Sequence, residues 1–241
     1  MAVALGLSGS PALAQSSAGL GPLVSSLGQP HSGEMVGVLR LVLGLAVLSV
    51  APALLMMVTA FTRIVIVLSF LRGALGTQSI PPNSVLAGLA LFLTFFVMYP
   101  TVDQIQQHAV QPYTQGKLSY QEALTEGSKP LHEFMLRQTR DRDLLLFVQI
   151  SGLPQQPPKP ALPMRILIPA FMTSELRTAF EIGLVLYLPF LVIDLVVAST
   201  LMSMGMMMVP PAMISLPLKV LLFVMADGWL LLTRSLVVSF R

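Results

Sequence analysis

Three ionisable residues lie inside the last two long apolar segments of the chain, where a charge needs a physical reason. The segments cover residues 182–201 and 213–232, and they carry Asp194, Lys219 and Asp227. A charge at the centre of a membrane helix costs about 2.5 to 3.5 kcal/mol on insertion scales, so such residues usually face a protein interior or water. Here they could relay ions in a transporter, or they could pair with one another.

Asp194 and Lys219 lie about 12 residues before and after the centre of the turn that joins the two segments. In an antiparallel hairpin this symmetry predicts similar depth and an ion pair, within one subunit or between two. Two roles stay open for the pair: it only stabilises packing, or it takes part in gating. Asp227 lies near the end of its segment beside Trp229, a residue that favours membrane interfaces, so we expect it to be solvated.

The turn between these segments consists of methionines, one glycine and two prolines instead of polar residues. Six of the chain's 15 methionines lie between residues 202 and 213, and Met206, Met207 and Met208 are consecutive. Methionine can repack around different surfaces, and Pro210 and Pro211 argue against a continuous helix. Such methionines can be ordinary packing residues. Their density favours a hydrophobic gasket that closes a pore where several copies meet, because apolar constrictions can gate by dewetting.

The composition is that of a membrane protein. The chain has 241 residues, of which 54% are hydrophobic and 10% charged, against about a quarter charged in soluble domains. Cysteine is absent, and no phosphate-binding glycine loop, zinc-protease motif or serine-hydrolase elbow occurs. His31, His108 and His132 are too scattered for a recognisable metal site. We therefore expect no enzyme activity, no cofactor and no metal.

Four regions follow from the pattern along the chain. Residues 1–35 are rich in Gly, Ser, Ala and Pro. The sequence ALA at residues 12–14, before Gln15, is typical of the cleavage site of a secretory signal peptide, but no Lys or Arg precedes it. A truncated or cleaved signal and a flexible N-terminus both remain open. Residues 36–102 form a first apolar hairpin, with segments 41–60 and 85–99. The apolar pattern continues past Arg63 to residue 71, and Arg63 and Arg72 predict a cytoplasmic tip.

The remaining two regions are a polar insertion and a second apolar hairpin. Residues 103–165 hold nearly half of the charges and end in a proline-rich linker, so we expect a solvated helical domain on the periplasmic side. Its apolar run 144–148, with Phe147, is either the core of that domain or a subunit contact. Residues 166–241 form the second hairpin, with a helix start expected near residues 173–175. The fold class is therefore an all-α membrane protein, with two long kinked hairpins and a polar helical insertion between them.

Four stretches resemble the FliP family of flagellar type III export proteins and their counterparts in virulence secretion. They are FTRIVIVLSFLR at residues 61–72, FMTSEL at 171–176, LPFLVIDLVVAS at 188–199 and MGMMM at 204–208. The resemblance covers about residues 41–240. It implies a bacterial inner-membrane protein of the flagellar basal body, with five copies in a helical ring and a periplasmic portion. Pro52, Pro189 and Pro217 would kink helices that are buried against other subunits.

The resemblance also implies a function and partners. Members form the core of an export gate with FliQ-like and FliR-like proteins, beside FlhB-like and FlhA-like export proteins, and pass unfolded flagellar proteins through an oligomeric channel. Residues 206–208 map onto the family's methionine gasket, and Asp194 and Lys219 onto its intramembrane charges. Arg63, Phe147, Glu175 and Asp227 are candidates for subunit contacts. The alternative is an ion- or proton-coupled transporter of small solutes; a membrane enzyme lacks catalytic residues here.

Overall fold

The computed structural model describes residues 32–77, 79–152, 158–206 and 208–240. The chain divides into two units, Met1–Pro52 and Ala53–Arg241. The predicted cleavage motif at residues 12–15 lies outside the described residues. Every regular element within the described ranges is a helix, which confirms the predicted fold class.

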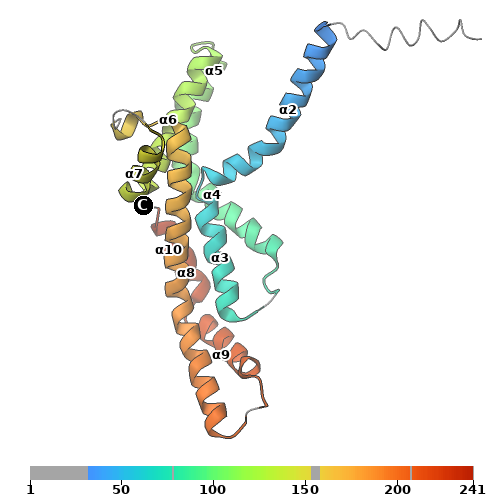
Figure 1. Cartoon of the computed structure of the whole chain (residues 1–241), viewed down its shortest axis with the longest axis vertical. Helices are drawn as coiled ribbons and strands as arrows, with labels where there is room; N and C mark the ends of the chain where they lie inside the picture. The colour runs from blue at the N-terminus through green and yellow to red at the C-terminus, as the bar shows by residue number, and fades with distance from the viewer. Residues whose placement is uncertain (1–31, 78, 153–157, 207, 241) are drawn as a thin grey trace, which may run out of the picture. The chain divides into compact units, whose positions relative to one another are not determined.

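The helices follow the chain in the order shown in Figure 1. They are α2 (Ser32–Met57), α3 (Phe61–Leu75), α4 (Asn83–Ile105), the π-helix η1 (Gln106–Val110), α5 (Gln111–Thr114), α6 (Tyr120–Gln138), α7 (Asp141–Ile150), the 3-10 helix η2 (Lys159–Ala161), α8 (Met164–Ser203), α9 (Pro211–Met225) and α10 (Gly228–Val238).

Three of the described helical stretches are long and apolar enough to cross a membrane, and the bent pair α9 and α10 makes a fourth if it counts as one span. The first, Gly37–Met57 in α2, continues through Pro52. The apolar pattern that runs from residue 41 to residue 71 forms two helices, α2 and α3, instead of one long helix. Thr59 and Thr62 donate hydroxyl hydrogen bonds to the Met56 carbonyl, and the backbone turns there before α3 begins.

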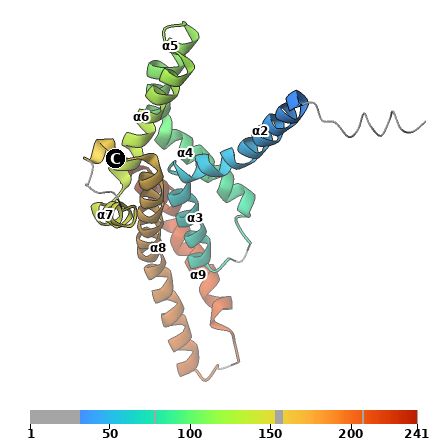
Figure 2. The same cartoon turned by 45° about the horizontal axis from the view of Figure 1, so that its top comes forward.

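The core of the second unit is built where α3 packs along α8 (Figures 1 and 2). Thr62 contacts Met172 at one end of α3, and Phe70 contacts Phe180 towards the other, so the two helices run parallel. The α3 side chains that face α8 and its neighbours are almost fully buried: Ile64, Val67, Leu68 and Leu71. One face of α3 therefore packs against protein along the length of the helix.

Replacing Gly183 with alanine is expected to destabilise the chain by about 1–3 kcal/mol, because overpacking forces neighbours out of place. A Cβ atom at Gly183 would lie 2.7 Å from ring carbons of Phe70, and that ring is held by an edge-on contact with Phe180. Thermal unfolding of the detergent-solubilised protein measures the loss. Gly88→Ala is the matched control in α4, where a Cβ meets nothing within 4 Å. Equal melting temperatures for the two variants would contradict this packing.

The predicted polar insertion is helical and begins as a continuation of α4. After η1 and α5, the chain turns and enters α6 through a capping box. Ser119 Oγ accepts from the Glu122 N–H at 3.3 Å, and the Glu122 carboxylate accepts from the Ser119 N–H at 2.8 Å. These hydrogen bonds lower the pKa of Glu122, because they favour its charged form.

Helix α7 divides the apolar run 144–148 between two environments. Leu144 and Val148 are buried, Leu145 and Leu146 are exposed, and Phe147 is half-buried against the core. Figure 2 shows α7 beside α8, on which it packs. One face of the run thus belongs to the core, while a subunit contact through its other face stays a prediction.

Helix α8 begins earlier than the sequence indicated. It starts at Met164 and has 40 residues, about 60 Å of helix, so the start expected near residues 173–175 is wrong. Ser174 and Glu175 are fully buried and form tertiary hydrogen bonds instead of capping a helix: Ser174 Oγ donates to Asp143 at 2.6 Å, and Glu175 accepts from Arg63.

The last apolar segment, predicted over residues 213–232 as one stretch, is broken. α9 and α10 meet at an angle of 65°. Asp227 has φ 51° in the left-handed region, and the Phe223 ring lies where a side chain at Gly228 would be, 2.2 Å from its Cβ position. Asp tolerates this backbone better than most residues, and glycine has no Cβ to clash. These two adjacent positions therefore allow the bend.

Candidate functional site

The tip between α8 and α9 is a helix end closed by a Schellman motif. Gly205 takes the left-handed conformation with φ 75°. Its N–H donates to the Met202 carbonyl at 3.1 Å, and the Met206 N–H donates to the Leu201 carbonyl at 3.0 Å. Pro210 and Pro211 then start α9 without needing N–H donors. The predicted helical hairpin is present, and its turn is made of methionines.

The methionine side chains at this tip are exposed. The exposed fraction is 97% for Met208, 68% for Met204 and 41% for Met206. Met207 lies outside the described residues. By contrast, Met98 and Met135 are buried in the core. The tip methionines therefore do not fill the core of their own chain, and they present an apolar, deformable surface at one end of the second unit (Figures 1 and 2).

Asp194 and Lys219 form an ion pair between α8 and α9. Lys219 Nζ donates to Asp194 Oδ2 at 2.5 Å. The two side chains differ in environment, since that of Lys219 is 6% exposed and that of Asp194 is 42% exposed. Ser215, one helical turn before Lys219, is also buried on this side of α9. The buried member of the pair is the cation.

Lys219 also faces the end of α3. Gly76 closes that helix in the left-handed conformation, and a Cβ atom there would lie 3.9 Å from Lys219 Nζ. A cation is favourable at a helix C-terminus, where the carbonyl groups and the helix dipole present negative charge. The ammonium group thus joins three elements, α3, α8 and α9, at the point where the hairpin leaves the rest of the unit.

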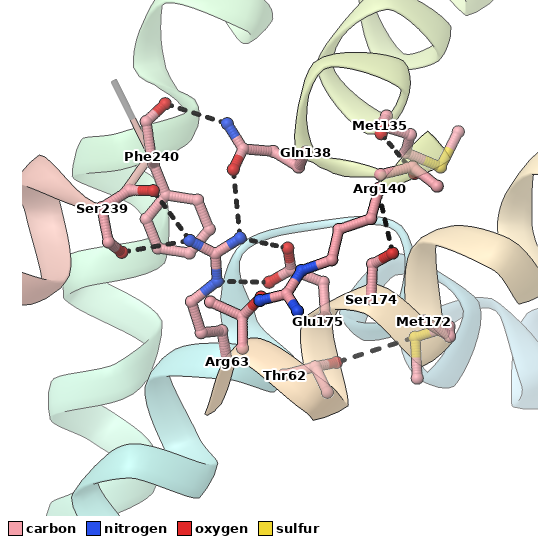
Figure 3. A network of polar contacts seen from close by, with 12 residues as sticks. Thr62, Arg63, Met135, Gln138, Arg140, Met172, Ser174, Glu175, Ser239 and Phe240 are labelled. Carbon is pink, nitrogen blue, oxygen red and sulfur yellow. Dashed lines mark hydrogen bonds and ion pairs between the residues drawn. The ribbon is translucent and has the colours of Figure 1, made fainter. Parts of the chain in front are cut away.

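Arg63 and Glu175 form a second, fully buried ion pair (Figure 3). Arg63 Nε donates to Glu175 Oε2 at 2.8 Å, and Nη2 donates to Oε1, so the pair is bidentate. Nη2 also donates to Gln138 Oε1 at 3.0 Å, while Nη1 donates to the carbonyl and hydroxyl oxygens of Ser239 at 2.9 and 3.1 Å. Every guanidinium donor is therefore satisfied, as a buried arginine requires.

The end of the chain completes this network. The Arg63 guanidinium lies 3.9 Å from the centre of the Phe240 ring, and Gln138 donates to the Phe240 carbonyl at 3.0 Å. The network thereby joins four segments at one point, as Figure 3 shows: α3, α6, α8 and the residues after α10. No local sequence pattern indicates Gln138, Ser239 or Phe240, since these polar and aromatic residues lie far from Arg63 along the chain.

A partly exposed charge cluster lies next to this network. Arg140 donates to both oxygens of Glu181 at 2.9 and 2.6 Å, and its backbone N–H donates to Ser174 Oγ at 3.0 Å. The hydrogen bonds to Glu181 raise the pKa of Arg140, so it stays charged. Arg177 lies 3.7 Å from Asp143. These contacts fix α7 and the end of α6 to α8.

The predicted subunit-contact residues lie in different environments. Arg63 and Glu175 use their polar atoms within the chain, so a contact of either with another subunit would require the network to open. Phe147 is half-buried and Asp227 is exposed. For all four residues, a subunit contact stays a prediction. Among the described residues, no group of three or more His, Cys, Asp or Glu side chains is arranged to hold a metal ion.

Comparison with known proteins decides the family. Residues 44–236 match the FliP family. The chain belongs to the FliP family. It is 55% identical over 213 residues to the flagellar biosynthetic protein FliP of Pectobacterium carotovorum subsp. carotovorum, which covers 88% of this chain and 82% of that protein. It is 54% identical to FliP of Bacillus subtilis over 83% of this chain and 91% of the relative.

A third relative gives the same result. FliP of Aquifex aeolicus is 49% identical over 211 residues, which is 87% of this chain and 88% of the relative. The matched region of the FliP family contains both ion pairs and the methionine tip. This FliP-family chain is therefore a component of flagellar biosynthesis and export, with apolar helices suited to a membrane location.

Proposed function

We propose that this FliP-family chain is a core pore-forming subunit of the flagellar type III protein export gate. Several copies, five by the family resemblance, form a ring with FliQ-like and FliR-like proteins, beside FlhB-like and FlhA-like export proteins. Unfolded flagellar proteins cross the bacterial inner membrane through the centre. Residues 206–208 of each copy form a gasket that seals against ions and deforms around a passing chain.

The observation that carries this proposal is the exposed methionine tip. Met204 and Met208 are more than half exposed at the end of a hairpin, although methionine is a residue that cores readily bury. An apolar tip of this kind gains stability by meeting other apolar surfaces. Tips of several copies around one axis would bury one another and form an apolar constriction, which excludes water and ions by dewetting.

An apolar groove beside α4 supports assembly with other subunits. Phe92, Phe95, Phe96 and Tyr99 of α4 are exposed, and together with Phe134 and Phe240 they line a groove of about 650 Å³. A second subunit seated in this groove would bury these rings.

The loop after α3 gives independent support. Gly76 lies at the depth of Asp194 and Lys219, and at the two ends of this loop Arg72 of α3 is hydrogen-bonded to Asn83 of α4. The loop thus begins beside the Asp194–Lys219 pair, near the middle of the apolar stretch of α8. A loop at this depth is tolerated where protein or a water-filled space surrounds it and not where it faces lipid.

A second candidate is an ion- or proton-coupled transporter of small solutes, because Asp194 and Lys219 pair inside an apolar hairpin. The mass of the detergent-solubilised complex separates the two. Expressed with its proposed partners, the chain is expected to form a ring of several copies extended by those partners. A stable monomer or dimer under the same conditions would remove the shared axis and favour the transporter.

A further inference from the structure

We propose that the methionine tip is a site of reversible oxidation by peroxides, and that sulfoxide formation there opens the gasket. The residues are Met204, Met206 and Met208, whose side chains are exposed. The oxidation is a property of the single chain, whereas its effect on the pore rests on the proposed function.

The reaction needs only an accessible thioether and a peroxide. The sulfur attacks one oxygen of hydrogen peroxide, the O–O bond breaks and an S–O bond forms. The sulfur is oxidised by two electrons to the sulfoxide, and the second oxygen leaves as water with both protons. Methionine sulfoxide reductases reverse the step, with a dithiol as the electron donor. The chain contains no cysteine, so no thiol of this protein competes for the oxidant.

The tip differs in its surroundings from other methionines of the chain. Met98 and Met135 are buried in the core. Met57 and Met225 are exposed, but they lie in helical stretches that are apolar enough to cross a membrane, where lipid or detergent covers them. The turn at residues 204–210 lies between α8 and α9, where two such stretches end. Peroxide dissolved in water therefore reaches the sulfurs of this turn.

A sulfoxide at the tip would find few hydrogen-bond donors. Residues 195–218 contain no Asp, Glu, His, Lys or Arg. The N–H groups of Gly205 and Met206 already donate to carbonyls of α8, and the hydroxyls of Thr200 and Ser203 donate to their own helix. The two prolines that follow have no N–H group. An oxidised sulfur therefore brings water with it, because burying a polar group without a hydrogen bond is unfavourable.

Hydration of the tip removes the physical basis of the seal. An apolar constriction excludes ions because water does not wet it, and a sulfoxide makes the same constriction polar. Leucine is the matched replacement, since it is apolar, close to methionine in volume and inert to peroxide. The variant M204L/M206L/M207L/M208L therefore keeps the seal and removes the response to peroxide.

The first test is oxidation of the full-length, detergent-solubilised protein, purified without partners, by dilute hydrogen peroxide. Peptide mass spectrometry reads the sulfoxide at each position. Met204, Met206 and Met208 are expected to react at least about tenfold faster than the buried Met98 and Met135, because susceptibility follows exposure. Equal rates at the tip and in the core would overturn the proposal, whatever the function of the tip.

The second test is the conductance of the assembled complex in a planar bilayer before and after peroxide, with the sulfoxide at the tip confirmed by mass spectrometry. The conductance is expected to rise towards that of the alanine variant M206A/M207A/M208A. It is expected to fall again after treatment with methionine sulfoxide reductases and a dithiol. The leucine variant is expected to stay sealed in peroxide.

The alanine and leucine variants separate this proposal from the gasket itself. If the alanine variant leaks while the oxidised complex stays sealed, the redox proposal is wrong and the gasket stands. If neither leaks, the gasket is overturned, and the effect of oxidation with it. A leucine variant that leaks in peroxide as the unaltered complex does would show that the oxidation acts elsewhere, which also contradicts the proposal.

Discussion

Replacing Glu175 with alanine is expected to destabilise the chain by about 3–5 kcal/mol, because it leaves a buried cation without its counter-ion. Arg63 is 2% exposed and Glu175 is fully buried, so water cannot replace the lost carboxylate without opening the core. The remaining partners of Arg63 are neutral oxygens and the ring of Phe240. Chemical denaturation of the solubilised protein, followed by circular dichroism, measures the change in the free energy of unfolding.

Two further variants serve as controls for Glu175→Ala. Glu126→Ala removes an exposed carboxylate that pairs with Lys129, and such surface pairs contribute about 0–1 kcal/mol. The double variant Arg63→Met/Glu175→Met removes both charges and is expected to be less destabilised than Glu175→Ala alone. If Glu175→Ala were as mild as Glu126→Ala, the buried network would not hold the four segments together as described.

The second prediction is that replacing the two members of the Asp194–Lys219 ion pair lowers the stability of the chain by different amounts. Asp194→Asn is expected to cost about 1–3 kcal/mol, since it leaves the buried ammonium of Lys219 with only neutral partners and the end of α3. Lys219→Met is expected to cost less than Asp194→Asn, because the Asp194 carboxylate that it leaves unpaired is 42% exposed, whereas the Lys219 side chain is 6% exposed. Denaturation midpoints of the two single variants measure this asymmetry.

The double variant completes that experiment. Asp194→Asn/Lys219→Met removes the unpaired cation, so it is expected to be more stable than Asp194→Asn alone. Equal losses for the two single variants would show that the environments of the two side chains are alike, contrary to their exposed fractions. A larger loss for Lys219→Met would instead show that capping α3 outweighs the ion pair.

The sequence predicts much of the fold because apolar segments and prolines carry local signals. The all-α class, the polar helical insertion and the turn at Pro210 and Pro211 all follow from composition and spacing. The spacing of Asp194 and Lys219 about the turn also places them at one depth, where the structure pairs them. In each case, a short stretch contains the physical cause.

What the sequence did not predict depends on contacts between distant segments. The start expected for α8 near residues 173–175 rested on side chains that look like caps, yet Ser174 and Glu175 bond to α7 and α3. The bend at Asp227 depends on a left-handed backbone and on the ring of Phe223. No short sequence pattern indicates the partners of Arg63 or the close contact of Phe70 with Gly183.

The central claim is that methionines at the tip seal a shared pore. It is tested most directly by the ion conductance of the assembled complex in a planar bilayer, with and without Met206→Ala, Met207→Ala and Met208→Ala together. We expect the triple variant to assemble and to leak ions, because alanine is too small to close the constriction. Met225→Ala, an exposed methionine away from the tip, is expected to stay sealed. A fully assembled triple variant whose conductance equals that of the unaltered complex would contradict the gasket.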